Sequence, residues 1–309
     1  MTHSAKNQLN SRWVVGLGEL LWDCLPDGRK AGGAPANFAC HAAALGGNGA
    51  IVSAVGDDAD GTALIQAFSR PGLNTDGVAH LAGLPTGMVL VHLDAKGQPS
   101  YEIREGVAWD ALPWSPTLAT IAARTEAVCF GTLAQRDPRS RMTIYRFLDS
   151  LPADCLRIFD MNLRQNYFNR EVILESLSRC DVLKVNHEEL IVVRELLNLT
   201  GSDEAALIEV RRTFRLRAAV VTNGSAGSLL VHEGGAHAQA ALAVDCVDSI
   251  GAGDSFAATL AQGLLQQMPP AVAHAAAARV AAAVCGSVGA TPPLPESLLA
   301  SLWPISVSC

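Results

Sequence analysis

The sequence lacks the features that mark membrane, secreted and nucleic-acid-binding proteins. No run approaches the roughly 18 apolar residues of a membrane span, and the first residues lack the apolar core of a signal peptide. The 23 Lys and Arg are outnumbered by 30 Asp and Glu, and the net charge of −7 argues against a broad basic surface for nucleic acid. We therefore expect a cytoplasmic protein with no nucleic-acid or membrane partner.

Paired cysteines and several common nucleotide and metal motifs are missing too. None of the eight cysteines forms a CxxC pair, and most lie in apolar runs such as AVCF, which predicts buried, reduced thiols rather than disulfides or a zinc site. The chain has no GxxxxGK[ST], no GxGxxG, no HExxH and no protein-kinase HRD or DFG set. A P-loop enzyme and a protein kinase are excluded, and a dinucleotide site has little support.

Strand-like apolar runs and helical patterns alternate along most of the 309 residues, a length that allows two average domains or one large α/β domain. The alternation predicts an α/β fold with a mostly parallel sheet and helices on both faces. Strands are expected at 13–22, 49–56, 126–131, 156–160, 181–186 and 218–224. Helices are expected at 36–45, 61–69, 138–149, 170–178, 187–197 and 203–214.

Polar residues directly follow, or end, three of these runs. They form the segments Asp160-Met-Asn162-Leu-Arg164, Lys184-Val-Asn186 and Thr222-Asn223-Gly224. Ligands bind beyond the carboxyl ends of the strands in such sheets, so these groups are candidates for one site. The last segment, continued to Gly227, suits a nucleotide-phosphate loop and equally an ordinary β-turn.

Residues 86–106 interrupt the alternation. They read as two extended runs around an Ala-Lys-Gly-Gln turn, which predicts a hairpin. The hairpin suits a lid over the ligand end of the sheet, and an ordinary edge hairpin is the equal alternative.

A glycine pair opens the first helical run, in the segment GGAPAN of residues 32–37. Gly32 and Gly33 let the backbone approach a ligand closely, and Asn37, one turn into the helix, can donate and accept hydrogen bonds to hydroxyl groups. The alternative is a tight strand-to-helix turn whose helix ends at Gly46-Gly47. Asp23, after an earlier apolar run, could accept hydrogen bonds from vicinal hydroxyls, although a solvated turn residue explains it better in isolation.

Asn186 and Glu189 are three positions apart at the start of a helix. An amide oxygen and a carboxylate so placed suit Mg²⁺ held through water, because Mg²⁺ takes only one or two direct protein ligands. The same spacing fits a helix capping box, with Asn at the N-cap and Glu at N3. The two interpretations are compatible.

The segment Gly251-Ala252-Gly253-Asp254 precedes an amphipathic helix. Its bare amides and the helix dipole suit an anion, yet Asp254 places a carboxylate at the same helix end. Taken alone, Asp254 is best explained as a helix cap.

Together these segments resemble the ribokinase-like (PfkB) carbohydrate kinases, in the right order over nearly the whole chain. GGAPANFACHAAALGG and DSIGAGDSFAATL are similar to the two long family motifs, and KVNHEEL contains the N-x-x-E element. GELLWD, YEIREGVAWD and FDMNLR most resemble the fructokinase branch, although 2-keto-3-deoxygluconate kinases share several of these features. The resemblance implies a single ribokinase-like domain over 1–309, a three-layer fold with a small β-sheet lid formed by about 86–106 and about 20–31.

The resemblance further implies ATP-dependent phosphorylation of a sugar hydroxyl, most simply of fructose, with Mg²⁺ and, in some members, a monovalent cation such as K⁺. Asp254 would be the catalytic base, with Gly251, Ala252 and Gly253 as the anion hole. The sugar would contact Asp23, Gly32, Gly33, Asn37, Tyr101 and Arg104, with Asn162 and Arg164 near the phosphoryl-transfer end. The nucleotide and Mg²⁺ would lie along Lys184, Asn186, Glu189, Thr222, Asn223, Gly224 and Gly227, and Asp248 would order the loop or bind the monovalent cation.

Two departures from the family pattern leave alternatives open. Alanine stands near position 278, where relatives often have Asn beside the adenine, and Glu105-Gly106-Val107 replaces the small residues common after the lid. A 2-keto-3-deoxygluconate kinase would need a cation for its substrate, from Arg104 or Arg164, and a nucleoside kinase would need an aromatic shelf, from Trp109 or Phe130. A non-catalytic sugar-binding regulator is the third alternative, disfavoured by the intact Asp254.

The hairpin at 86–106 also bears on assembly. We expect it to expose alternating apolar residues on its first strand, at Val89, Val91 and Leu93. Because members of the resembled family often dimerise through their lids, we expect a homodimer.

Overall fold

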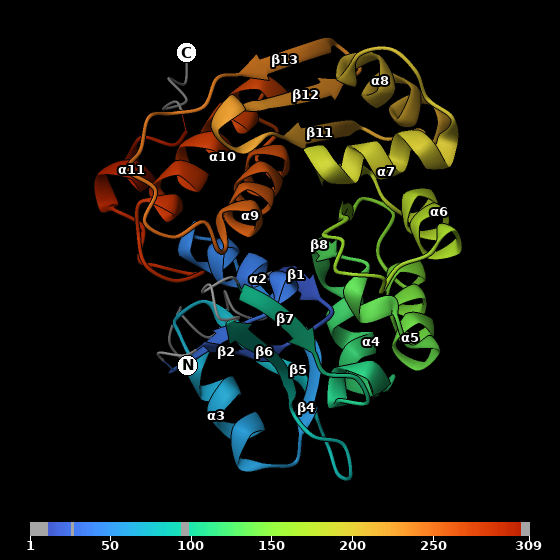
Figure 1. Cartoon of the computed structure of the whole chain (residues 1–309), viewed down its shortest axis with the longest axis vertical. Coiled ribbons are helices and arrows are strands. Elements are labelled where there is room, and N and C mark those ends of the chain that lie inside the picture. Colours follow the sequence, from blue (N-terminus) through green and yellow to red (C-terminus); the bar gives the residue numbers. More distant parts are fainter. Residues whose placement is uncertain (1–11, 26–27, 94–98, 304–309) are drawn as a thin grey trace, which may run out of the picture. The chain divides into compact units, whose positions relative to one another are not determined.

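The structure, a computed structural model, describes residues 12–25, 28–93 and 99–303, without the side chains of 91–100. It divides into two compact units, unit 1 (Met1–Cys155) and unit 2 (Leu156–Cys309), each with its own strands and helices (Figure 1). Among the described residues, no helix combines the length and apolar character needed to cross a membrane. The single-domain organisation over 1–309 stays a prediction.

Unit 1 contains four parallel strands in the order β8-β1-β4-β5. The strands are β1 (Trp13–Leu17), β4 (Gly49–Gly56), β5 (Leu73–Leu81) and β8 (Thr125–Phe130). The helices of this unit are α2 (Ala34–Ala44), α3 (Ala59–Ala67), α4 (Pro116–Ala123) and α5 (Pro138–Asp149), with short 3-10 turns η1 (Ala108–Ala111) and η2 (Leu133–Gln135). Helix α2 packs on β1 and β4, so the residues that begin α2 lie close to the parallel strands.

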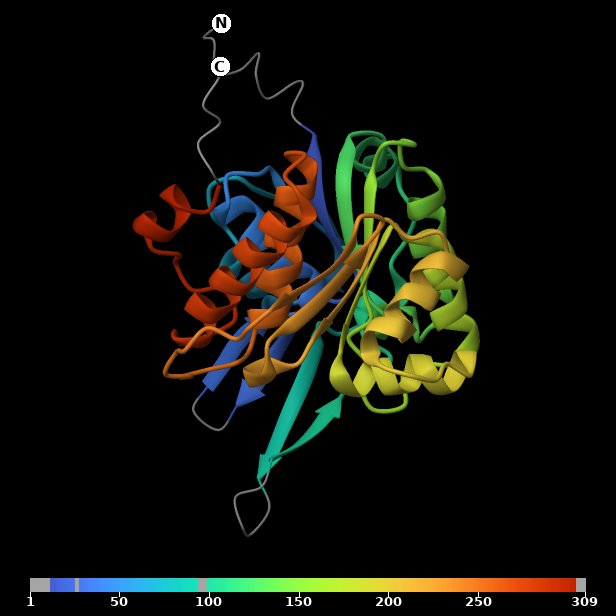
Figure 2. The same ribbon diagram turned by 90° about the horizontal axis from the view of Figure 1, so that it is seen from above.

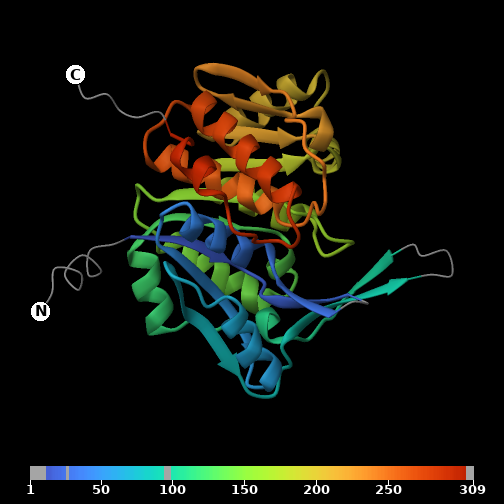
Figure 3. The same ribbon diagram turned by 90° about the vertical axis from the view of Figure 1, so that its left-hand side faces the viewer.

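A second sheet of unit 1 has the order β3-β2-β6-β7. Its strands are β2 (Leu21–Leu25), β3 (Gly28–Gly32), β6 (Gly87–Leu93) and β7 (Pro99–Ile103). The pairs β2/β3 and β6/β7 are antiparallel, and β2 and β6 join them in parallel. The pair β6/β7 is the hairpin expected at 86–106, and it extends away from the parallel strands of its unit (Figure 3). Its Ala-Lys-Gly-Gln turn lies outside the described residues.

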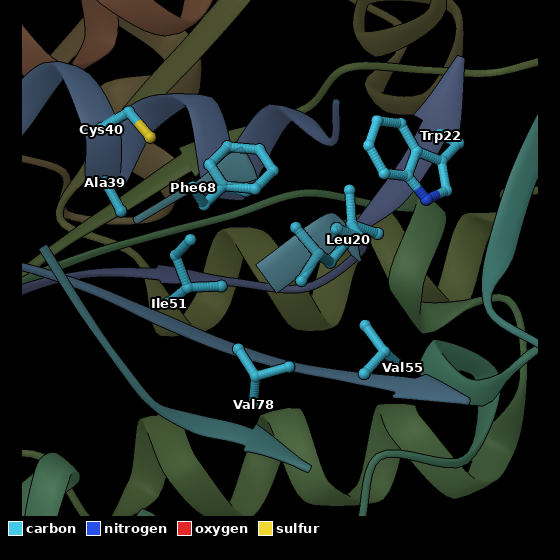
Figure 4. Packing of buried hydrophobic residues seen from close by; sticks show 10 residues of the cluster. Leu20, Trp22, Ala39, Cys40, Ile51, Val55, Phe68 and Val78 are labelled. Carbon is cyan, nitrogen blue, oxygen red and sulfur yellow. The ribbon is translucent and has the colours of Figure 1, made fainter. Parts of the chain in front are cut away.

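The apolar core of unit 1 forms between α2, α3 and the parallel strands (Figure 4). Phe68 and Cys40 from the helices meet Ile51 and Val55 of β4, and Leu20 and Trp22 close the cluster at the start of the small sheet. Burial raises the pKa of the Cys40 thiol to about 12, so this thiol stays protonated. The same buried cluster therefore fixes both α2 and the first strand of the small sheet.

Unit 2 has a parallel set of strands continued by an antiparallel edge, in the order β13-β12-β11-β10-β9. The strands are β9 (Leu156–Asp160), β10 (Val182–Asn186), β11 (Ala218–Thr222), β12 (Ser228–His232) and β13 (Gly235–Gln239). The helices are α6 (Arg170–Arg179), α7 (His187–Leu197), α8 (Asp203–Thr213), α9 (Ala252–Leu265), α10 (Pro270–Cys285) and α11 (Glu296–Ala300), and η3 (Gly224–Ala226) is a 3-10 turn. Helices α9 and α10 cover one face of these strands and α6 to α8 the other, which gives three layers (Figure 2).

The expected α/β class is confirmed, and the differences are local. The apolar run 13–22, expected as one strand, forms β1 and β2 in two different sheets. The chain leaves the parallel sheet at Gly18, whose φ is 151°. The break between β1 and β2 therefore depends on backbone conformation, which the apolar content of the run does not show. Strand β5, helix α4 and the β12/β13 hairpin were not among the expected elements.

The thiol and lid predictions each need a correction. The seven described cysteines are free, but Cys246 is exposed rather than buried, because it lies in the extended segment before α9. Val89, expected on an exposed lid face, is buried within unit 1, since it pairs with Asp23 of β2 and Ile103 of β7. The side chains of Val91 and Leu93 lie outside the described set, so dimerisation through the lid stays a prediction.

A buried histidine in unit 2 makes stability depend on pH. His274 of α10 is inaccessible to solvent and contacts the Ser228 hydroxyl (Nε2 to Oγ, 2.7 Å) and His237 (Nδ1 to Nδ1, 2.9 Å). Burial, with a smaller effect of His237, lowers the pKa of His274 to about 4. Between pH 6.5 and 4 the unfolded chain therefore binds a proton that the folded chain does not, and stability falls as the pH falls.

We expect this group to remove about 2 kcal/mol of unfolding free energy between pH 7 and pH 5. Denaturant unfolding of the wild type and His274→Gln at both pH values measures it, because the variant should lose less stability than the wild type over this interval. His80→Gln, on the exposed part of β5, is the control and should keep the wild-type dependence. Equal pH dependence in the wild type and His274→Gln would contradict the prediction.

Candidate active site

The polar residues predicted to share one edge do so in unit 2. Strands β9, β10 and β11 are parallel neighbours, and their register sets Lys184 opposite Asp160 and Asn186 opposite Thr222. The carboxyl ends of three strands thus place four of these groups at one end of the sheet. This is the end at which ligands bind in open α/β sheets.

Lys184 and Asp160 form a buried ion pair at this edge. The Lys184 Nζ lies 2.9 and 2.8 Å from the two carboxylate oxygens of Asp160, and each side chain is only 8% exposed. A Cβ added to Gly253 would lie 3.2 Å from the same Nζ, so the ammonium group reaches the backbone at the start of α9. The pair therefore joins two strands of the sheet to the Gly-Ala-Gly segment.

The charges around Lys184 are unequal in number. Burial alone would lower the pKa of Lys184, but the charges of Asp160, Glu189 and Asp254 outweigh burial and raise the pKa above its usual value. Burial and the charge of Asp160 also raise the pKa of Glu189. One ammonium thus faces three carboxyl groups, an arrangement that a further cation would stabilise.

Asn186 and Glu189 form the capping box that their spacing allows. The Asn186 Oδ1 accepts a hydrogen bond from the Glu189 amide, and the Glu189 Oε2 accepts one from the Asn186 amide, both at 2.8 Å. The Glu189 Oε1 accepts a third from the Leu163 amide, also at 2.8 Å. Each carboxylate oxygen keeps lone-pair capacity beyond one N–H, so an Mg²⁺-bound water can still be accepted. The oxygen atoms of Asn186 and Glu189 are suitable for Mg²⁺, and their role in binding it stays a prediction.

Helix α9 begins without a side-chain cap, and its Ala252 amide donates to the Ser249 carbonyl at 3.3 Å. Its N-cap is Gly251, with φ 81°, and a Cβ there would lie 2.0 Å from the Ala290 carbonyl oxygen. Only glycine combines this left-handed conformation with so close an approach. Asp254 occupies the third helical position, so the structure does not support its interpretation as the cap. Its carboxylate lies instead at the positive end of the helix, which favours the ionised form.

Asp248 fastens the segment before α9. Its Oδ1 accepts the Ile250 amide at 3.0 Å and its Oδ2 accepts the Gly289 amide at 3.1 Å. Both oxygens therefore already bind backbone within unit 2. This geometry shows the loop-ordering function directly, and the monovalent-cation role stays a prediction.

The segment from Thr222 to Gly227 is a tight turn. Asn223 donates its amide to the Gly227 carbonyl at 2.8 Å around η3, and both Gly224 (φ 54°) and Gly227 (φ 93°) need left-handed backbone. Among the described atoms the buried Asn223 Oδ1 has no hydrogen-bond partner. The segment therefore forms the ordinary turn that was one of the two interpretations. The Asn223 Oδ1 can still accept a hydrogen bond from a ligand.

Asn162 and Arg164 lie in the loop after β9. Asn162 is half-buried and has a left-handed φ of 44°. Asn tolerates this backbone conformation better than most residues. Arg164 is exposed, and its guanidinium donates to the Leu163 carbonyl at 3.0 Å. The Met161 amide donates to the Lys184 carbonyl, which places Asn162 close to strand β10. Arg164, by contrast, lies in solvent.

The predicted sugar contacts in unit 1 gather at the start of α2 and on β2. A Cβ on Gly32 would lie 2.3 Å from the Asp23 Oδ2, so this carboxylate lies directly against the Gly32 backbone. Gly33, with φ 117°, is the N-cap of α2 and approaches the Glu19 carbonyl just as closely. Asn37 is buried in the first turns. The amides of Gly46 and Gly47 close the end of α2 on the Ala43 and Ala42 carbonyls, as the alternative interpretation expected.

The remaining predicted sugar contacts are on β7 and just after it. Tyr101 is 57% exposed, and the exposed Arg104 donates its amide to Met88 of β6 while its carbonyl accepts from Arg136. Tyr101 and Arg104 therefore lie on the β6/β7 side of the small sheet, and Asp23 lies on its inner strand β2. Trp109 and Phe130 are both only 1% exposed, and Arg136 covers the Trp109 ring at 4.0 Å, so neither ring offers an aromatic shelf.

Sequence reasoning missed the role of Asp160 itself. It was noted only as the start of a polar segment, whereas the structure makes it the partner of Lys184. The signal was present, since a carboxylate and a lysine each near the end of an apolar strand call for partners once buried. The pairing became visible only with the register of β9 on β10.

Residues 25–297 match the pfkB family of carbohydrate kinases, so the chain belongs to that family and is a sugar kinase, a phosphotransferase. Fructokinases of Escherichia coli and Klebsiella pneumoniae are each 29% identical to it. The first match covers 82% of this chain and 83% of the relative, and the second covers 90% and 92%.

Solved structures agree with this family. The fructokinase of Xylella fastidiosa with bound ATP is similar with a TM-score of 0.81 at 24% identity, over 94% of this chain and 97% of that chain. An uncharacterized sugar kinase of Pyrococcus horikoshii is similar with a TM-score of 0.76 at 26% identity, over 90% and 93%. The expected ribokinase-like α/β fold, with a mostly parallel sheet and a small second sheet, is confirmed.

Proposed function

We propose that the protein is a fructokinase that transfers the γ-phosphoryl group of Mg-ATP to a hydroxyl of fructose. The observation that carries the proposal is the start of α9, where Asp254 follows the backbone of Gly251 to Gly253 next to the Lys184 ammonium. Backbone amides and an ammonium stabilise a transferring phosphoryl group without reorganisation, and a carboxylate can accept the proton of the attacking hydroxyl.

The remaining residues take supporting roles in this proposal. Asp23, the Gly32-Gly33 backbone and Asn37 of unit 1 offer acceptors and donors for sugar hydroxyls, and Tyr101 and Arg104 add contacts from β7 and the residues after it. Asn162 and Arg164 act near the phosphoryl group. The nucleotide lies along β10, β11 and the turn after them. Relatives support these partners, since the fructokinase structure from Xylella fastidiosa contains ATP, and one from Vibrio cholerae contains fructose, ADP and calcium.

A sugar panel tests the substrate. With Mg-ATP, we expect the kcat/KM for fructose to exceed that for glucose, mannose and ribose by at least about 10-fold, because a site built to hydrogen-bond hydroxyls rejects a misplaced one. ADP release measures it. A larger kcat/KM for 2-keto-3-deoxygluconate or for a nucleoside would overturn the fructose assignment and leave the sugar-kinase family intact. The buried Trp109 and Phe130 argue against the nucleoside.

The metal dependence tests the role of Glu189. Chelation of divalent metal should abolish turnover, and Glu189→Gln should raise the Mg²⁺ concentration for half-maximal rate by about 10-fold, because the lost charge weakens a water-bridged metal. Glu188→Gln, the exposed neighbour in the same turn, is the matched control. An unchanged Mg²⁺ requirement in folded Glu189→Gln would limit Glu189 to the capping box.

A further inference from the structure

A pocket outside the candidate active site lies in unit 2, at the start of β11 and the end of β12. Its cavity of about 620 Å³ is of the size of small-molecule sites, about 300–1,000 Å³. The end of α8, the start of β11 and the end of β12 line it together with Leu264 of α9 and Pro270 of α10. Strand β11 runs from Ala218 at this pocket to Thr222 at the candidate active site, so the two sites lie at opposite ends of one strand.

The lining of this pocket is strongly cationic. Its arginines are Arg211, Arg212, Arg215 and Arg217. His232 adds a titratable nitrogen, and Glu233 is the one acidic residue of the lining. Within the described ranges these four arginines form no ion pair, whereas three others of unit 2 each pair with a carboxylate, namely Arg157, Arg179 and Arg194. The pocket thus holds positive charge that the described protein does not neutralise.

The turn after α8 sets the backbone conformation of Arg215 at this pocket. The Arg215 φ of 55° is left-handed, directly after Phe214, the C-cap of α8, and the Leu216 amide closes the turn on the Arg211 carbonyl at 2.9 Å. Such helix ends favour Gly or Asn, and Asn198 has the same conformation after α7. An arginine here therefore costs stability relative to glycine or asparagine.

The chemistry of the lining selects the ligand. Guanidinium groups bind phosphate oxygens with paired N–H donors, and several of them together need more negative charge than one carboxylate carries. The apolar wall of Leu264 and Pro270 leaves room for the uncharged part of a small molecule. We propose that this pocket is a second anion site, which binds a small molecule carrying phosphoryl groups.

Calorimetric titration of the intact protein with inorganic tripolyphosphate, without metal and at low salt, tests the proposal. The wild type should show a binding event that R212Q/R215Q/R217Q weakens at least 10-fold. The matched control is R139Q/R141Q/R146Q, three arginines on α5 of unit 1, which should change the affinity less than twofold. The pocket variant should also keep kcat and the KM for ATP within twofold, so loss at the candidate active site is distinguishable.

The single variant R215G separates binding from folding. Because glycine adopts the left-handed conformation freely, the Tm should rise by about 1–3 °C while the affinity for tripolyphosphate falls severalfold. Titrations with metal-free ATP and with fructose 6-phosphate, each compared with the pocket variant, then show whether a nucleotide or a sugar phosphate binds more tightly here. Wild-type binding in both pocket variants, or an equal loss in the α5 control, would overturn the proposal.

Discussion

Asp254→Asn is expected to lower kcat by about 10²–10⁴-fold, the usual contribution of a general base. The amide of asparagine cannot accept the proton of the attacking hydroxyl, whereas the amides of Gly251 to Gly253 that would hold the phosphoryl group are unchanged. The KM for sugar and for Mg-ATP should therefore stay within about threefold of the wild type. Steady-state kinetics with ADP detection measures both constants.

The control for this variant is Asp245→Asn, the same change at an exposed position before α9. It should retain wild-type kinetics. Because Asp254 also lies in the first turn of α9, its removal should cost only about 0.3–1 kcal/mol of stability, which thermal unfolding detects separately. Turnover of Asp254→Asn within threefold of the wild type would show that Asp254 only stabilises the helix end, and the sugar-kinase family would still hold.

The local parts of this site could be predicted from sequence because their interactions span a few residues. The Asn186/Glu189 capping box follows from i,i+3 spacing, and the helix end at Gly46-Gly47 follows from the needs of left-handed backbone. The succession of apolar runs and helical patterns likewise fixes the α/β class. In each case the partners are neighbours in the chain, so their spacing alone places them together.

Other parts depend on contacts between distant segments. The break between β1 and β2 falls where α2 packs closely, since a Cβ on Gly18 would lie 2.8 Å from the Pro35 Cγ. The reason for glycine at 251 is the carbonyl of Ala290, nearly forty residues away. Asp254 shows the consequence for function, because its local pattern indicated a cap and only the position of Gly251 showed otherwise. Spacing carries no information about such approaches.

The Lys184–Asp160 pair depends most on such distant contacts, and Lys184→Met should destabilise the protein by about 3–5 kcal/mol. The substitution keeps the length of the side chain but leaves the Asp160 carboxylate buried without its partner. The matched control is Arg157→Met, which breaks a more exposed pair between Arg157 of β9 and Asp181, the residue before β10. That change should cost only about 0–1 kcal/mol. Denaturant unfolding compares the two.

The double variant Asp160→Asn/Lys184→Met separates structure from catalysis. Removing both charges relieves the buried carboxylate, so much of the lost unfolding free energy should return. The kcat should not return, because the ammonium beside Gly253 is absent in both variants. Recovery of kcat together with stability would show that Lys184 only neutralises Asp160. Recovery of stability without recovery of kcat would mean that the Lys184 ammonium acts on the transferring phosphoryl group. Asp160 would then serve to position that ammonium.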